Sequence, residues 1–283
     1  MRLWIGAMLA FLTAACSPLS MFNAAVPKDA AAGRALTDIP FGDGPRRMLD
    51  VYPGSGPAGA KPVMVFVYGG SWDSGRRQDY RWVGRALAAQ GFLTIVPDYR
   101  LVSEVKFPGF EEDCAAAVRW ARDHAAEHGG DPDRIVLVGH SAGAYNVMML
   151  GLDRRFLDAA GVPQSAIRGV IGLSGPYDFY PWDTAVSETA FGSYPDPLQT
   201  QPVTFARADA APLLLLHGGA DTTVRPRNVA RLEARVKAAG GRVQTKIYEG
   251  VDHKGMVLAL SKPFRGKSTV LADVTAFARD VTR

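Results

Sequence analysis

The sequence contains a serine in a setting typical of catalytic nucleophiles. The apolar run RIVLV is followed by Gly139-His140-Ser141-Ala142-Gly143, a G-x-S-x-G pentapeptide, and then by the helix-like pattern AYNVMML. In a strand-turn-helix arrangement the two glycines let strand and helix cross closely. The sharp turn exposes the serine hydroxyl at a helix N-terminus, which favours developing negative charge. This context favours Ser141 as a nucleophile over a turn residue.

A serine hydroxyl needs a base to accept its proton, and His253 is the histidine best placed to do so. It follows the predicted strand VQTKIYEG and lies downstream of the serine. Asp221 follows the buried run PLLLLH, in a loop where its carboxylate can hold one imidazole tautomer and stabilise the charged ring. Asp252, Asp98 and Glu249 remain alternative orienting carboxylates, and Asp221 is preferred.

Structural roles are expected for the other four histidines. His140 lies inside the pentapeptide and is expected to pack beside the nucleophile, and His217 ends a buried strand. His124 and His128 form H-A-A-E-H, which matches the H-x-x-E-H pattern of zinc peptidases. This stretch lies at the polar end of a helix and has no obvious third ligand. We therefore expect a solvated helix face there and no metal site.

The segment VFVYGGSWDSG predicts a site for a developing oxyanion. Two consecutive glycines after a central strand let backbone amides approach a substrate without interference from side chains. The expected donors are the amides of Gly70 and Ser71, together with that of Ala142 after the nucleophile.

The chain alternates short apolar runs with longer amphipathic ones, which predicts a mostly parallel sheet covered by helices. Strands are expected over 46–53, 62–68, 92–99, 134–139, 167–174, 212–218 and 243–250, with an antiparallel pair near 35–53. Helices are expected over 79–90, 109–128, 141–152, 224–240 and 267–281. Ligands of such sheets bind beyond the carboxyl ends of the strands, where the candidate residues fall.

The composition suits an ordinary globular enzyme or binding protein. The 283 residues are 47% hydrophobic, enough to bury a full core in one or two domains. The net charge of +4 is spread through mixed Arg, Asp and Glu without a run of like charge. That distribution argues against a nucleic-acid-binding surface.

The N-terminus predicts export. MRLWIGAMLAFLTAAC has a basic Arg2, an apolar stretch and small residues before Cys16, as in a secretory signal over 1–15. The end of this segment resembles the lipobox of bacterial lipoproteins, in which the cysteine becomes the lipidated first residue. Thr13 stands where leucine is usual, and simple secretion or an uncleaved anchor are the alternatives.

The signal defines the expected domain organisation. Residues 16–33 are expected to form a lipidated tether, and 34–283 the catalytic domain. Only Cys114 remains for disulfide pairing, so it is expected to be a buried small hydrophobe. The expected location is the cell envelope or periplasm, and Ser17 after the cysteine favours the outer membrane by resemblance to lipoprotein sorting.

Five segments together resemble one family: YGGSW, PDYRL, HGGDPDRIVLVGHSAGA, LLLLHGGAD and GVDH. They resemble the serine esterase branch of the α/β-hydrolase superfamily, which includes kynurenine formamidase-like, feruloyl-esterase-like and prenylcysteine methylesterase-like enzymes. The resemblance spans about residues 45–280. It implies an α/β-hydrolase fold with a short cap insertion and a triad in the order Ser141, Asp221, His253. Tyr68 replaces the usual histidine of the HGG motif, which bears on loop hydrogen bonding and substrate preference.

The resemblance implies hydrolysis through an acyl-enzyme, without a cofactor, of a small-molecule ester. Pocket walls are expected from Trp72 and from Tyr177, Phe179 and Trp182 in the aromatic segment 175–196, although core packing explains each residue equally well. The short insertion favours a carboxylesterase acting on small to medium acyl groups. An aryl formamidase with the same triad and a catalytically silent, membrane-tethered binding protein are the alternatives. The oligomeric state stays open.

Overall fold

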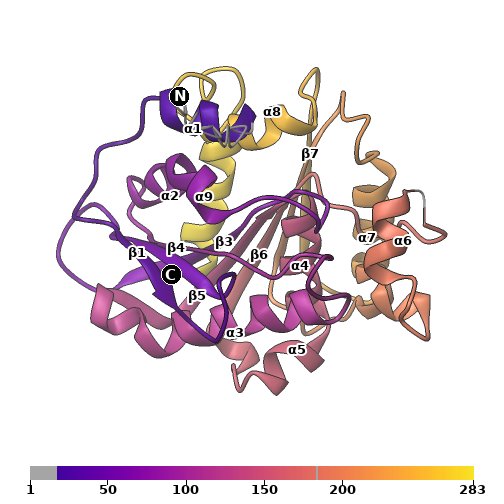
Figure 1. Ribbon diagram of the computed structural model, residues 1–283. Helices are drawn as coiled ribbons and strands as arrows, with labels where there is room; N and C mark the ends of the chain where they lie inside the picture. Colours follow the sequence, from indigo (N-terminus) through magenta and orange to yellow (C-terminus); the bar gives the residue numbers. More distant parts are fainter. Residues whose placement is uncertain (1–17, 183) are drawn as a thin grey trace, which may run out of the picture.

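A central sheet organises the protein in this computed structural model, which describes residues 18–182 and 184–283 (Figure 1). The strands are β1 (Leu36–Pro40), β2 (Met48–Tyr52), β3 (Lys61–Val67), β4 (Leu93–Pro97), β5 (Gly130–His140), β6 (Ile167–Leu173), β7 (Leu213–Gly218) and β8 (Val243–Tyr248). Their order in the sheet is β1-β2-β4-β3-β5-β6-β7-β8. β2 pairs antiparallel with β1 and β4, and every pair from β4 to β8 is parallel. The predicted mostly parallel sheet with an antiparallel start is confirmed.

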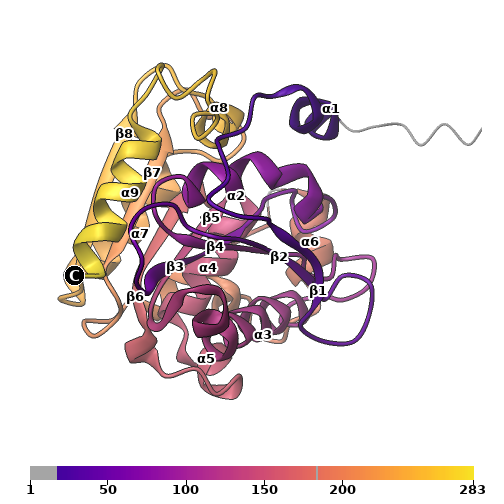
Figure 2. The same cartoon turned by 90° about the vertical axis from the view of Figure 1, so that its left-hand side faces the viewer.

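Helices cover both faces of this sheet (Figures 1 and 2). They are α1 (Pro18–Ala25), α2 (Arg81–Ala88), α3 (Gly109–His124), α4 (Ala142–Leu152), α5 (Arg154–Ala159), α6 (Ala185–Phe191), α7 (Arg227–Ala238), α8 (His253–Leu258) and α9 (Val270–Val281). α2 and α9 lie on one face, and α3, α4 and α7 lie on the other. None of the helices in the described ranges is long and apolar enough to cross a bilayer.

The central strands are apolar on both faces because both faces are covered. Every residue of β7 is buried, and so are the last five residues of β3. This burial explains the continuous apolar runs PVMVFV and PLLLLH, which would alternate in a sheet with one solvated face.

Two element boundaries differ from the sequence-based expectation by four residues, and the others by fewer. β5 begins at Gly130, four residues before the apolar run RIVLV. The strand includes these polar residues because Gly130 still pairs with Lys61 of β3. The expected helix over 109–128 ends at His124 and continues as a 3₁₀ turn, which Gly129 closes with a left-handed φ of 76°. Neither shift moves a residue of the candidate site.

The segment expected as a tether is folded onto the domain from Pro18 onward. α1 places Phe22 edge-on against Trp82, with ring centroids 5.4 Å apart. Asp29 forms an ion pair of 2.7 Å with Arg265, which lies 236 residues further along the chain. Hydrogen bonds from Ser20 to Asp79 and from Asn23 to the Gln78 carbonyl add to these contacts, and none of them is visible as local periodicity. The predicted signal segment and Cys16 lie outside the described residues.

α3 contains a buried carboxyl group that no basic residue neutralises. Glu111 is fully buried, and neither of its carboxyl oxygens has a hydrogen-bond partner among the residues that the structure describes. Burial raises the pKa of Glu111 well above its usual value, and the nearby Asp153 carboxylate adds to the effect. This shift favours the protonated form of Glu111 in the folded protein.

Replacement of Glu111 by Gln should stabilise the protein increasingly as the pH rises. The unfolded wild-type chain ionises this group near a pKa of about 4.3, whereas the folded chain keeps its proton. The wild type thus loses about 1.4 kcal/mol of folding free energy per pH unit above that point. Urea unfolding of wild type and Glu111→Gln at pH 5, 6 and 7 measures the growing difference. A difference that is constant with pH would contradict a protonated Glu111.

Candidate active site

The turn between β5 and α4 holds Ser141 in a strained conformation. Its φ is 56° and its ψ is −122°, values that are rare for a residue with a side chain. A Cβ on Gly139 would lie 2.1 Å from the Gly143 carbonyl oxygen, and one on Gly143 would lie 2.1 Å from the Val67 carbonyl oxygen. Glycine is therefore required at both positions. The crossing leaves the Ser141 side chain partly exposed at the end of β5.

The structure brings Ser141, His253 and Asp221 into one hydrogen-bonded series. His253 is the first residue of α8, and its Nε2 lies 2.9 Å from the Ser141 Oγ. Its Nδ1 lies 2.7 Å from Asp221 Oδ2. This geometry lets the imidazole accept the hydroxyl proton through Nε2 while the carboxylate holds the proton on Nδ1.

Two backbone amides fix the Asp221 carboxylate. Its Oδ1 accepts hydrogen bonds from the amides of Thr223 at 2.9 Å and Val224 at 2.8 Å. Burial alone would raise the pKa of Asp221, but the hydrogen bonds from His253 and the Val224 amide outweigh it and hold the pKa below its usual value. The lowered pKa keeps the Asp221 carboxylate ionised at neutral pH. His217 supports the same loop, because its Nε2 donates to the Val224 carbonyl over 2.8 Å.

Two of the three alternative carboxylates hydrogen-bond to other groups, and the third is exposed to solvent. Asp252 caps α8 by accepting from the Gly255 amide over 2.7 Å. Asp98 accepts from the Tyr68 hydroxyl over 2.8 Å. Glu249 is exposed. Among these carboxylates, only Asp221 contacts the His253 ring.

His140 supports the base through the main chain. Its Nε2 lies 3.0 Å from the carbonyl oxygen of His253, and the two rings are 4.9 Å apart. Because a carbonyl only accepts, the Nε2 atom of His140 carries the proton. Burial and the neighbouring His253 lower the pKa of His140 to about 3, so the ring stays neutral. The sequence predicted packing beside the nucleophile but not this bond.

The expected oxyanion loop lies against the nucleophile. A Cβ on Gly69 would lie 2.7 Å from the Cβ of the serine. The loop turns through positive φ angles at Gly70 (132°), Ser71 (52°) and Trp72 (59°). The amides of Gly70, Ser71 and Ala142 donate to no group in the described ranges, so they are available to an oxyanion.

Trp72 and Phe179 belong to a packed aromatic cluster. The Trp72 ring is 4.8 Å from Phe191 and 5.2 Å from Tyr145, both edge-on, and it stacks on Phe179 at 6.0 Å. Its indole N–H donates to Asn146 Oδ1 over 2.9 Å. Both Trp72 and Phe179 are almost completely buried. The packed side chains of Trp72 and Phe179 therefore fill the space on one side of the site.

The other two residues expected to line the pocket lie differently. Tyr177 has no exposed surface, and its ring fills the space above Gly172 and Gly175. The structure thus places the Tyr177 ring in the core, because local aromatic content does not reveal which ring covers a glycine of the sheet. Trp182 is partly buried and packs against Tyr180, which is 40% exposed. Tyr180 and Trp182 thus form the solvent-facing part of this segment.

The H-A-A-E-H stretch is a surface feature. His124 and His128 both stack on Trp120, with ring centroids at 4.7 and 5.8 Å. His124 Nδ1 also lies 3.0 Å from Glu127. Across residues 18–182 and 184–283, no three His, Cys, Asp or Glu side chains are grouped as metal ligands. Cys114 is buried, as expected.

Two curated relatives share the sequence over most of this chain. Isoprenylcysteine alpha-carbonyl methylesterase of Arabidopsis thaliana is 28% identical over 256 residues, which cover 83% of this chain and 60% of that protein. Esterase LipC of Mycobacterium tuberculosis is 29% identical over 220 residues, which cover 70% and 54%. The chain thus spans little more than half the length of these relatives.

Solved esterase structures share the fold. A truncated carbohydrate esterase from gut microbiota has a TM-score of 0.78 at 19% identity, covering 91% of this chain and 99% of its own. The propionate-bound esterase Est2 of Thermogutta terrifontis has a TM-score of 0.70 at 24% identity, covering 88% and 94%. These similarities and the sheet order confirm the predicted α/β-hydrolase fold. The BD-FAE family model matches residues 49–236, more than half of the chain, and the chain therefore belongs to the BD-FAE family.

Proposed function

We propose that the protein is a serine hydrolase that cleaves carboxylic esters of small to medium acyl groups. The observation that carries this proposal is the hydrogen-bonded series from Ser141 through His253 to Asp221, with distances of 2.9 and 2.7 Å. The curated relatives are named esterases or methylesterases, which supports the same reaction class.

The residues of the site provide both halves of an acyl transfer. Ser141 Oγ attacks the ester carbonyl while His253 Nε2 accepts its proton, and the carbonyl oxygen becomes an oxyanion. Collapse of this intermediate breaks the bond to the alcohol, which leaves with the proton from His253, and the acyl group stays on Ser141. Water then attacks the acyl group with His253 again as the base, and the acid is released. Asp221 stabilises the imidazolium in both steps, and no cofactor takes part.

Three backbone amides are the proposed oxyanion donors. Gly70 and Ser71 provide two from the loop after β3, and Ala142 provides the third at the start of α4. Donors held in place before the reaction stabilise the transition state without reorganisation, and the loss of one such donor typically lowers the rate by about 10²–10³-fold. The strained backbone of the loop is consistent with amides held for this purpose.

The aromatic cluster beside the loop supports a small acyl group. Trp72, Tyr145, Phe179 and Phe191 are nearly or fully buried and fill the space next to the oxyanion loop. A long acyl chain on this side would have to displace packed rings, which is costly in a close-packed interior. The Thermogutta terrifontis esterase was solved with propionate and with butyrate bound, which are short carboxylates.

We also propose that the protein is exported and lipidated at Cys16. The sequence LTAAC and the apolar stretch before it support this assignment. α1 begins at Pro18 and packs on the domain, so an acyl anchor at Cys16 would hold the domain close to the membrane surface rather than on a long linker. Several acyl chains on one residue would make this attachment stable.

The purified protein should hydrolyse p-nitrophenyl acetate and butyrate, and turnover should fall about tenfold or more for the octanoate, since extra methylenes must enter a packed site. Ser141→Ala should lower kcat on the order of 10⁴–10⁶-fold, because the nucleophile is lost. Initial rates with both proteins test this. A preference for octanoate would overturn the small-acyl assignment. Turnover of N-formylkynurenine without ester turnover would replace the esterase by an amidase.

The full chain, expressed in a bacterial host with an alkyne-tagged palmitate, should become labelled and fractionate with membranes. Cys16→Ser should abolish the label, because the thiol that carries the lipid is gone. Cys114→Ser is the matched control, since it removes the other cysteine of the chain and should leave labelling unchanged. An unlabelled wild type, or a label that persists in Cys16→Ser, would refute lipidation at this residue.

A further inference from the structure

The loop expected to bind the oxyanion runs through left-handed backbone conformations, which strain its non-glycine residues Ser71 and Trp72. Gly70, Ser71, Trp72 and Gly75 all have positive φ, at 132°, 52°, 59° and 104°. Strained conformations of this kind persist only where surrounding contacts determine them. The groups that hold the two ends of this loop therefore decide where its amides point.

Tyr68 holds the entrance of the loop from beneath. Its side chain is fully buried and stacks between Tyr80 at 5.3 Å and Tyr99 at 4.9 Å. Its hydroxyl donates to Asp98 Oδ1 over 2.8 Å, and its own carbonyl accepts from the Tyr99 hydroxyl over 3.1 Å. Burial, followed by the Asp98 charge, raises the pKa of Tyr68 well above its usual value, so the hydroxyl keeps its proton.

Arg46 holds the exit of the loop. Its Nη2 donates to the Gly75 carbonyl over 2.8 Å, and its Nη1 lies 3.4 Å from the Tyr68 hydroxyl oxygen. Glu104 forms an ion pair of 3.3 Å with the same guanidinium. A Cβ on Gly75 would come within 2.8 Å of the Tyr68 ring, so the exit of the loop lies directly on this ring. The Tyr68 side chain thus contacts both ends of the loop.

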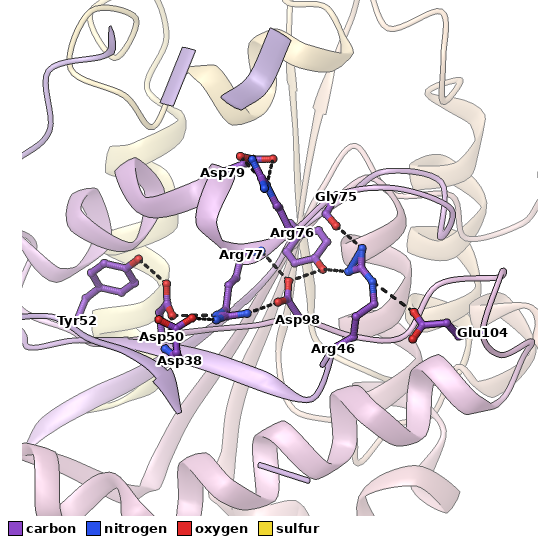
Figure 3. Close-up of polar contacts among 11 residues, drawn as sticks. Asp38, Arg46, Asp50, Tyr52, Gly75, Arg76, Arg77, Asp79, Asp98 and Glu104 are labelled. Carbon is purple, nitrogen blue, oxygen red and sulfur yellow. Dashed lines mark hydrogen bonds and ion pairs between the residues drawn. The ribbon is translucent and has the colours of Figure 1, made fainter. Parts of the chain in front are cut away.

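A buried charge network fixes the acceptor of the Tyr68 hydroxyl. Asp98 accepts from the Arg77 amide over 2.6 Å and pairs with the Arg77 guanidinium, which also pairs with Asp50 at 2.9 Å and with Asp38. Figure 3 shows this guanidinium between the carboxylates, with Arg46 and Glu104 on the far side of Asp98. Asp98, Arg77 and Asp50 are almost completely buried. Buried ion pairs add little net stability but define geometry, because breaking one leaves an uncompensated charge.

We propose that Tyr68 and Arg46 are positioning residues for the oxyanion loop, with Tyr68 anchored through Asp98 on Arg77. This inference rests on the proposed esterase function and assigns the role to Tyr68, which stands where relatives carry a histidine. The two side chains touch only the ends of the loop, so they act on the Gly70 and Ser71 amides through the backbone. Their loss weakens binding of the oxyanion and leaves the ground-state contacts of the ester in place.

Tyr68→Phe should lower kcat for p-nitrophenyl acetate about 10- to 100-fold with KM changed less than about twofold, because only the hydroxyl anchor of the loop is lost. Affinity for a trifluoromethyl ketone, whose adduct with the serine carries an oxyanion, should fall by a similar factor. Tyr80→Phe is the matched control. It removes a hydroxyl from the same aromatic stack, and that hydroxyl has no hydrogen-bond partner elsewhere in the described chain. Its kcat should match that of the wild type.

Arg46→Gln provides a second variant if Tyr68→Phe does not fold. Arg46 is partly exposed, so its replacement is less disruptive to the core, and kcat should fall several-fold at nearly constant KM. An unchanged kcat in the variants that fold, an equal loss in Tyr80→Phe, or a rise in KM alone would overturn the inference while the esterase assignment stands. A wild type without ester turnover would overturn the assignment and this inference together.

Discussion

The close crossing of three main-chain segments at Ser141 is the constraint on which the site depends. β5 enters the turn, α4 leaves it, and the end of β3 passes so near that a Cβ on Gly143 would lie 2.1 Å from the Val67 carbonyl oxygen. This crossing forces Ser141 into its strained φ of 56° and raises its hydroxyl above the sheet. It also presses the loop after β3 against the serine. The nucleophile and the expected oxyanion donors thus owe their proximity to the same packing.

The groups around this crossing are held in defined protonation states by different means. Asp221 stays ionised because two amides and the imidazole hydrogen-bond its carboxylate. His140 stays neutral because it is buried beside a second imidazole. On the opposite side of the oxyanion loop the constraint is geometric, because a buried guanidinium holds Asp98, which fixes a tyrosine hydroxyl. His253 Nε2 lies within hydrogen-bond distance of the Ser141 hydroxyl, the contact that an acyl transfer requires.

The order of elements and the three residues of the series could be predicted from the sequence, because each residue falls in the turn or loop after a predicted strand. Ser141 was marked by its flanking glycines, and Asp221 by the loop after β7. The docking of the segment that begins with α1 could not be predicted, since Asp29, which follows this helix, pairs with a residue 236 positions away. The burial of Tyr177 depends on a neighbour within the sheet. From the sequence, Tyr68 could be recognised only as a departure from the family motif. Its partners could not be predicted, because the fold alone brings the ends of β3 and β4 next to the 3₁₀ turn Arg77–Tyr80.

Covalent labelling tests whether Ser141 is an activated nucleophile, independently of the natural substrate. The purified protein would be treated with a fluorophosphonate, and the intact mass and tryptic peptides measured, with Ser141→Ala treated identically. An activated Ser141 should carry one phosphonyl group per wild-type chain, and the variant should carry none. An unmodified wild type, or the same labelling of the variant at another residue, would show that Ser141 is not an activated nucleophile.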